Sequence, residues 1–287
     1  MFQKARIYEL FLIHKYRKKD KRLPIFVYAI IVIKETITML KKQFDNNSFA
    51  LYSPDSLQYI TIDLEIVLNE SLELYKKIFD IDKFRKVQIN YFDNIEDFRN
   101  YIYELRGEKN SLPEYAKGTF DNGMINAFIQ PNIIEGTPSF IHRKYSASHE
   151  LFHIMYQELI LKKNNQNRII WFDEGMAQFF SGEKNKEMTL DFSNWLSMTK
   201  SNTKKIPNLN NLNHCSDFET KDYDGYNLSL LAIKYLYDKL GIDELKKMLS
   251  NNNMITELGN VIVQDAFNYY ENKYVKNRLI ENYLKYY

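Results

Sequence analysis

The chain has 287 residues, which is long enough to bury a substantial core in one large domain or in two lobes. Lys and Arg (39) nearly balance Asp and Glu (37), and a net charge of +2 lacks the basic character of nucleic-acid-binding domains, so no nucleic acid is expected as a partner. The single cysteine, Cys215, excludes an internal disulfide framework, so we expect a cytoplasmic protein, with secretion or membrane association as the alternative.

Residues 1–46 are predicted to form an N-terminal helical segment, with helices over residues 2–19 and 25–45. The apolar stretch over residues 24–33 is shorter than the roughly 20 residues that a membrane-spanning helix needs. We therefore predict a buried helix that does not span a membrane, and a membrane-proximal segment is the alternative. The sequence predicts no particular oligomeric state.

Residues 47–161 are predicted to alternate strands with helices and so to form a small α+β lobe. The helices should cover residues 56–79 and 95–105, where apolar side chains recur at helical spacing. Asn122-Gly123 should form the tight turn of a β-hairpin, because this pair readily adopts positive φ angles. The strands are expected at residues 48–52, 86–92, 118–121 and 124–130, and the helix that closes the lobe should start near Ser146.

Residues 162–287 are predicted to form an all-helical lobe. Polar connections such as residues 162–167 separate its helices. The helices are expected at residues 172–180, 190–198, 226–240 and 242–250, with a further helix from residue 262. The helix from Ser146 would then lie between the two lobes, where a cleft is expected.

This helix carries His149-Glu150-Leu151-Phe152-His153, which matches the pattern H-E-x-x-H. Residues four apart lie one above the other on a helix, so His149 and His153 can bind one zinc ion through neutral imidazole nitrogens. Glu150 is placed to accept the proton of a water molecule beside the ion and later to pass it to the leaving amine. The alternative is two surface histidines and a solvated acid.

A catalytic zinc site usually has three protein ligands, and we expect Glu174 to be the third. It follows His153 by 21 positions, which is enough for one helix to end and a second to pack back against it. Gly175 and Ala177 are small, so the second helix should approach the zinc-binding helix closely. Asp173 could fix the tautomer of a ligand histidine or cap the second helix. The alternative for Glu174 is an exposed acid at a helix start.

His149-Glu150-x-x-His153 followed by Asp173-Glu174-Gly175-x-Ala177 resembles the gluzincin metallopeptidases, which include thermolysin-like and aminopeptidase-N-like enzymes. The similarity covers about residues 48–275, and the zinc motif is its specific part. The resemblance implies an α+β zincin (thermolysin-like) fold, with a small mixed sheet and the active-site helix in the N-lobe and an all-helical C-lobe. It also implies a Zn²⁺ cofactor.

The resemblance further implies that Tyr226 is catalytic, because it matches the catalytic tyrosine of aminopeptidase-N-like enzymes. Its hydroxyl would donate a hydrogen bond to the oxygen anion that forms during hydrolysis. Tyr223 and His214 lie in the same stretch and are alternative donors, and Tyr226 could also serve only in packing.

The predicted strand from Met124 is expected to form the edge of the cleft, where Met124 and Asn126 would bind an extended peptide through the backbone. Aminopeptidase-N-like enzymes carry Gly-x-Met-Glu-Asn in this region, and its glutamate holds the substrate amine. Gly123-Met124-Ile125-Asn126 lacks this glutamate, which favours an endopeptidase.

We therefore expect a zinc metallopeptidase whose partner is a peptide or protein substrate. A catalytically inactive gluzincin-like protein that binds peptides or proteins is the alternative, although His149, Glu150, His153 and Glu174 are all present. A deformylase is disfavoured, because its cysteine ligand lies upstream of the motif, whereas Cys215 lies downstream.

Overall fold

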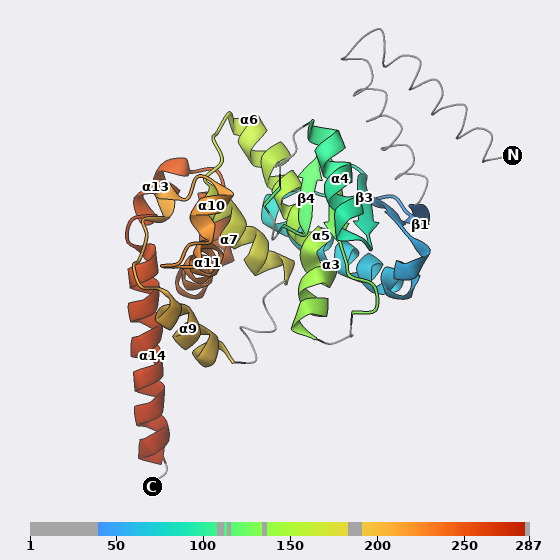
Figure 1. Cartoon of the computed structure of the whole chain (residues 1–287). Coiled ribbons are helices and arrows are strands. Elements are labelled where there is room, and N and C mark those ends of the chain that lie inside the picture. The colour runs from blue at the N-terminus through green and yellow to red at the C-terminus, as the bar shows by residue number, and fades with distance from the viewer. Residues whose placement is uncertain (1–39, 108–111, 114–115, 134–136, 183–190, 285–287) are drawn as a thin grey trace, which may run out of the picture.

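The computed structural model describes residues 40–107, 112–113, 116–133, 137–182 and 191–284, and these residues form an α+β protein (Figure 1). Within them, five strands make one mixed sheet in the order β1-β2-β3-β5-β4. The strands are β1 (Lys41–Asp45), β2 (Phe49–Ser53), β3 (Val87–Phe92), β4 (Gly118–Asp121) and β5 (Met124–Phe128).

The three inner strands of the sheet are parallel, and the two outer strands are antiparallel to their neighbours. A 3-10 helix (Asp55–Ile60) and α3 (Thr61–Phe79) connect β2 to β3, and α4 (Ile95–Arg106) follows β3. The side chains of β3 divide between two cores: Ile89 packs in the main core with α3, and Phe92 packs with the residues of α4. Helices therefore cover both faces of the sheet.

The predicted hairpin is confirmed. Strands β4 and β5 are antiparallel, and Asp121 pairs with Met124 across a two-residue turn. Asn122 and Gly123 both have positive φ angles, 50° and 73°, as this kind of turn requires.

The predicted helix over residues 25–45 is wrong at its described end, because Lys41–Asp45 form strand β1. The side chain of Asn46 accepts hydrogen bonds from the backbone N–H groups of Ser48 and Phe49, at 2.9 and 2.8 Å, and so forms a tight turn. This turn folds β1 back onto β2 and places it in the sheet. The rest of the predicted N-terminal helices lies outside the described residues.

The helix that carries the zinc motif, α5 (Pro138–Tyr156), starts eight residues earlier than the predicted Ser146. Thr137 caps it by accepting a hydrogen bond from Phe140 N at 3.2 Å, and Pro138 occupies its first turn. Beyond Tyr156 it continues directly as a π-helix (Gln157–Leu161) and then α6 (Lys162–Asn164), so the predicted lobe boundary after residue 161 falls inside one helical run.

The described residues after α6 are mainly helical, with one isolated β-bridge between Glu219 and Asp224. Helix α7 packs between α5 and α11, so the zinc motif is joined to the helical half through α7 (Figure 1). The helices are α7 (Ile170–Ser181), α9 (Phe192–Asn202), α10 (Cys215–Phe218), α11 (Gly225–Leu240), α12 (Ile242–Met248), α13 (Asn252–Leu258) and α14 (Ile262–Leu284).

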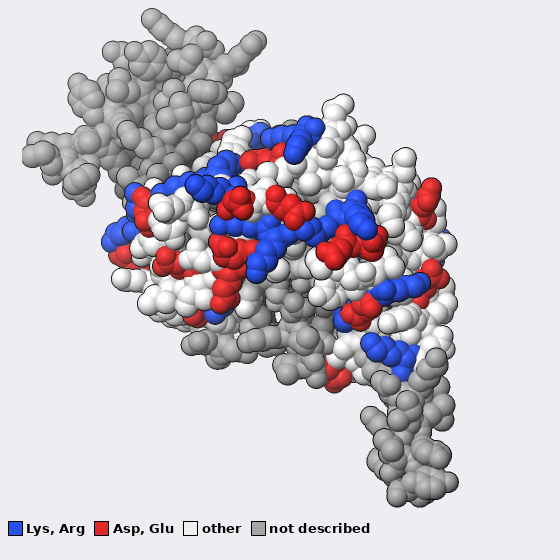
Figure 2. Space-filling view, turned by 180° about the vertical axis from the view of Figure 1, so that it is seen from behind, with Lys and Arg blue, Asp and Glu red and all other residues white. Residues whose placement is uncertain are grey.

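None of the helices within the described ranges is long and apolar enough to span a membrane. On the face shown in Figure 2, the described Lys and Arg side chains are interspersed with Asp and Glu and form no broad basic surface.

Candidate metal centre

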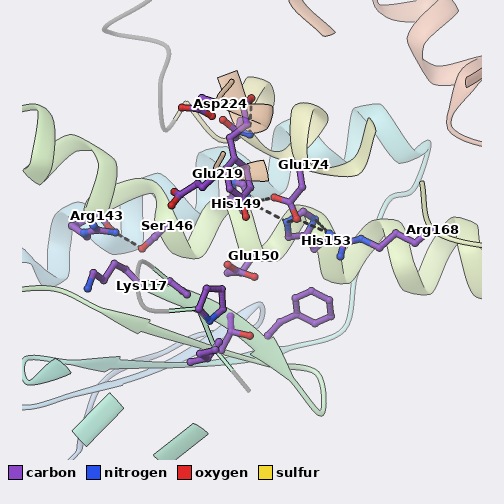
Figure 3. Close-up of a pocket in the computed structure, with 18 of the residues that line it drawn as sticks. Lys117, Arg143, Ser146, His149, Glu150, His153, Arg168, Glu174, Glu219 and Asp224 are labelled. Carbon is purple, nitrogen blue, oxygen red and sulfur yellow. Dashed lines mark hydrogen bonds and ion pairs between the residues drawn. The ribbon is translucent and has the colours of Figure 1, made fainter. Parts of the chain in front are cut away.

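The three expected zinc ligands meet at one point between two helices. His149 and His153 project from the same side of α5, and Glu174 reaches them from the first turns of α7 (Figure 3). The two Nε2 atoms are 3.0 Å apart. Glu174 Oε2 lies 3.3 Å from His149 Nε2, and Glu174 Oε1 lies 3.6 Å from His153 Nε2. Glu174 is therefore not an exposed acid, since its side chain is only 15% exposed.

These distances fit the geometry of a zinc ion. Zinc bonds of about 2.0–2.1 Å in a tetrahedral arrangement place neighbouring donor atoms about 3.3–3.4 Å apart. The two separations from His149 Nε2, 3.0 Å to His153 Nε2 and 3.3 Å to Glu174 Oε2, are close to that value. Two imidazole nitrogens and one carboxylate oxygen are also a donor set that zinc binds, with one position left for water. Within the described residues, this is the His/Cys/Asp/Glu group whose donor atoms converge in this way.

Asp173 fixes the orientation of one ligand. Its Oδ1 lies 2.8 Å from His153 Nδ1, and both side chains are buried. Because an ionised carboxylate only accepts hydrogen bonds, a proton of His153 is held on Nδ1, and Nε2 is the ring nitrogen that faces His149 and Glu174. Helix α7 starts at Ile170, so Asp173 lies inside the first turn and is not the N-cap.

Arg168, which the sequence did not indicate, ties the two acids of α7 together. Its Nε donates to Asp173 Oδ2, and its Nη2 donates to Glu174 Oε1 at 2.8 Å. This contact leaves Oε2 of Glu174 as the oxygen nearer to His149. Arg168 therefore positions Glu174 and helps to hold both carboxylates ionised.

The electrostatics of the metal-free cluster are those of a cation site. Burial raises the pKa values of Asp173 and Glu174, but Arg168 and His153 outweigh it, so the pKa of Asp173 is lowered and that of Glu174 is well below its usual value. Burial also opposes a charge on His153, but the two carboxylates raise its pKa to about 9. The two carboxylates therefore favour a positive charge beside the imidazoles.

Glu150 lines the same cavity, on the side of α5 that faces strand β4 (Figure 3). Gly118 at the start of β4 makes room for it, because a Cβ atom built on Gly118 would lie only 3.0 Å from Glu150 Oε1. The carboxylate of Glu150 therefore lies beside β4, in the cavity that His149, His153 and Glu174 also line.

Tyr226 lines the cavity from the first turn of α11. Its backbone oxygen accepts a hydrogen bond from Gln178 Nε2 at 3.4 Å, and its ring packs against Phe218 at 4.6 Å. The alternative donors, Tyr223 and His214, are not among the described residues that line the cavity.

The prediction that Met124 and Asn126 form the cleft edge is wrong. Strand β5 lies between β3 and β4, so both of its sides are already paired. Asn126 is fully buried and accepts a hydrogen bond from Asn90 Nδ2 at 2.9 Å. The sequence showed a hairpin but could not show which of its arms joins the sheet, and the outer arm is β4.

Strand β4 is an outer strand of the sheet, and no described strand pairs with its other edge, which is called the open edge. Lys117 O accepts a hydrogen bond from Phe128 N at 2.7 Å, so Lys117 is a hydrogen-bonded partner of β5. Because such pairs alternate along an antiparallel ladder, Gly118 and Phe120 direct their N–H and C=O groups away from β5. The cavity beside them has a volume of about 670 Å³, and His149, Glu150, His153, Glu174 and Tyr226 line it.

Gly175 has a different role from the one expected. A Cβ atom there would lie 2.6 Å from the backbone oxygen of Ser229 and 2.7 Å from Ile233 Cγ1. The small residue thus allows α7 to approach α11 closely, rather than α5. Since Glu174 is the preceding residue, this packing also sets the position of the third ligand.

Gly175→Ala is expected to lower the free energy of unfolding by about 1–3 kcal/mol, because the added methyl overlaps backbone atoms that cannot move aside. Zinc binding should weaken as well, since α7 must shift. Urea denaturation and zinc titration would measure both effects, with the exposed Ser197→Ala as a control. Wild-type stability in Gly175→Ala would contradict the close helix approach.

Comparison of the sequence with protein-family models and with curated proteins gave no match.

Proposed function

We propose that this protein is a zinc-dependent metallopeptidase with a zincin (thermolysin-like) fold, and that it acts as an endopeptidase. The observation that carries the proposal is the convergence of His149, His153 and Glu174, whose donor atoms all lie within 4.8 Å of one another. Glu150 lines the same cavity, and the open edge of β4 forms its opposite wall.

A zinc ion bound by these three residues would lower the pKa of its water and polarise the carbonyl group of the substrate. Glu150 would accept the proton that water loses on attack and pass it to the leaving amine. Tyr226, from the first turn of α11, would donate a hydrogen bond to the oxygen that becomes negative. Asp173 and Arg168 would keep His153 and Glu174 in place.

The edge of β4 supports a peptide substrate. Gly118 and Phe120 offer backbone donors and acceptors at the spacing of an extended chain, and such a chain can add to the sheet as a further strand. Because Gly118 lies beside Glu150, a peptide bound in this way would bring one of its bonds next to the general base. Glu150 and the strand edge thus serve the same substrate.

The proposal is tested by zinc titration of the metal-free protein and by cleavage assays. The assays use a library of internally quenched fluorogenic peptides, whose fluorescence rises when an internal bond is cut. We expect one zinc ion per chain and cleavage at internal bonds that a chelator abolishes and zinc restores. A protein that binds zinc and peptides but cleaves none of them would be the inactive binding protein instead.

Gly118→Ala is expected to lower peptide turnover about tenfold, because the methyl group would displace the Glu150 carboxylate by a few tenths of an ångström from its working position. Glu150 can move aside, so zinc content and the free energy of unfolding should stay close to wild type. Steady-state kinetics on the zinc-loaded protein would show the change. Unchanged turnover would mean that the space beside Gly118 does not determine the working position of Glu150.

A further inference from the structure

A second cavity of about 510 Å³ lies beside the first, and Phe120 lines both. It is bounded by the tip of the β4–β5 hairpin and by the end of the α5 helical run. Its other lining residues are mostly polar: Arg85, Asp121, Asn122, Gly123, Ile154, Gln157, Glu158 and Lys162.

The two cavities lie along the same pair of walls. One wall is a single side of α5 and its π-helical continuation, on which Glu150, His153 and Gln157 recur every three or four residues. The other wall is β4, which runs in the same direction. Gly118 lies beside Glu150, and the Phe120 ring lies 5.9 Å from the His153 ring. The cavities are therefore successive parts of one groove along the edge of β4.

The far end of this groove is held in shape by one arginine. Arg85 Nη2 donates to Glu158 Oε1 at 2.7 Å, and Arg85 Nε donates to Glu158 Oε2 at 3.0 Å. Its Nη1 donates to the backbone oxygen of Gly123 at 3.2 Å. Arg85 thus joins the π-helix to the hairpin turn. A π-helical turn within a longer helix is uncommon and often occurs at functional sites.

We propose that the second cavity binds the substrate residues that lie on the N-terminal side of the cleaved bond. This inference rests on the proposed peptidase function. A peptide added antiparallel to β4, the more stable pairing, has its N-terminal end towards Asp121. At about 3.4 Å per residue, the third or fourth residue before the cleaved bond reaches the second cavity.

The chemistry of the cavity indicates the substrate class. Amide groups of Gln157 and Asn122 can hydrogen-bond the main chain or polar side chains of a peptide, and the lining offers little apolar surface for a large aliphatic side chain. The substrate is therefore an extended polypeptide segment with several residues before the cleaved bond. A short peptide cut near its N-terminus would leave this part of the groove empty.

The experiment uses two peptide series with a common cleavage site, one lengthened stepwise at the N-terminal end and the other at the C-terminal end. We measure kcat/KM on the zinc-loaded protein and, for the same peptides, Kd on the zinc-loaded Glu150→Gln variant. We expect kcat/KM to rise and Kd to fall about tenfold when the third or fourth residue on the N-terminal side of the cleaved bond is added. Gln157→Trp and Lys162→Trp, which fill the second cavity, should abolish this gain, and the exposed Lys163→Trp should keep it.

The outcomes separate the two proposals. Length-dependent binding to Glu150→Gln without any cleavage by the wild type would support the groove and overturn the peptidase. Cleavage that does not depend on N-terminal length would support the peptidase and overturn the groove. The groove is also overturned if the gain survives both tryptophan variants, or if these variants remove a gain from C-terminal residues instead. Failure to bind or cleave any peptide overturns both.

Discussion

Glu150→Gln is expected to leave zinc binding unchanged and to lower peptide turnover by about 10²–10⁴-fold, the usual contribution of a general base. Glutamine has nearly the same shape, so the fit beside Gly118 is kept, but its amide cannot accept a proton from water. Glu150 is not among the three converging donors, so the metal should not depend on it. The decisive measurement is kcat at a zinc content equal to that of the wild type.

The control for this substitution is Glu70→Gln, which changes an exposed glutamate on α3 that does not line the cavity. It should retain wild-type kcat and zinc content. If Glu150→Gln retained full turnover with zinc bound, Glu150 would not be the base, and another residue of the cavity would have to take the proton.

The α5 part of the site could be predicted from the sequence because it depends on local geometry. His149, Glu150 and His153 lie within one turn of one helix, and their relative positions follow from helical spacing alone. The helix also carried a start signal, Thr137-Pro138, that would have placed its first turn correctly. Such local rules hold whatever the rest of the chain does.

The remaining features depend on contacts between distant segments, which spacing does not encode. That β4 and not β5 is the open edge follows from the pairing of β5 with β3, more than 30 residues earlier in the chain. A side chain at Gly175 would overlap Ser229 on α11. The sequence motif gave no sign of this contact. In the sequence, Arg168 is an ordinary loop residue before α7. Only the structure shows that it contacts both Asp173 and Glu174.

Glu174→Gln is expected to weaken zinc binding on the order of 10²–10³-fold. Zinc sites of four ligands bind with about 10–16 kcal/mol, so one ligand contributes roughly 2.5–4 kcal/mol on average. Glutamine keeps the size of the side chain but removes the negative charge, and it also weakens the contact with Arg168 Nη2 that orients this residue. Activity should fall with zinc occupancy and recover in part at high zinc concentration.

Competition with a coloured zinc chelator would give the affinities, with the exposed Glu257→Gln on α13 as a control. The same loss should appear in Glu174→Asp, whose carboxylate is one methylene too short to reach the imidazoles. If both variants bound zinc as tightly as the wild type, the third ligand would lie elsewhere. If only Glu174→Asp bound zinc as tightly as the wild type, the negative charge at this position would matter more than the length of the side chain. The combined result therefore tests the part of the site that joins the helical half of the chain to α5.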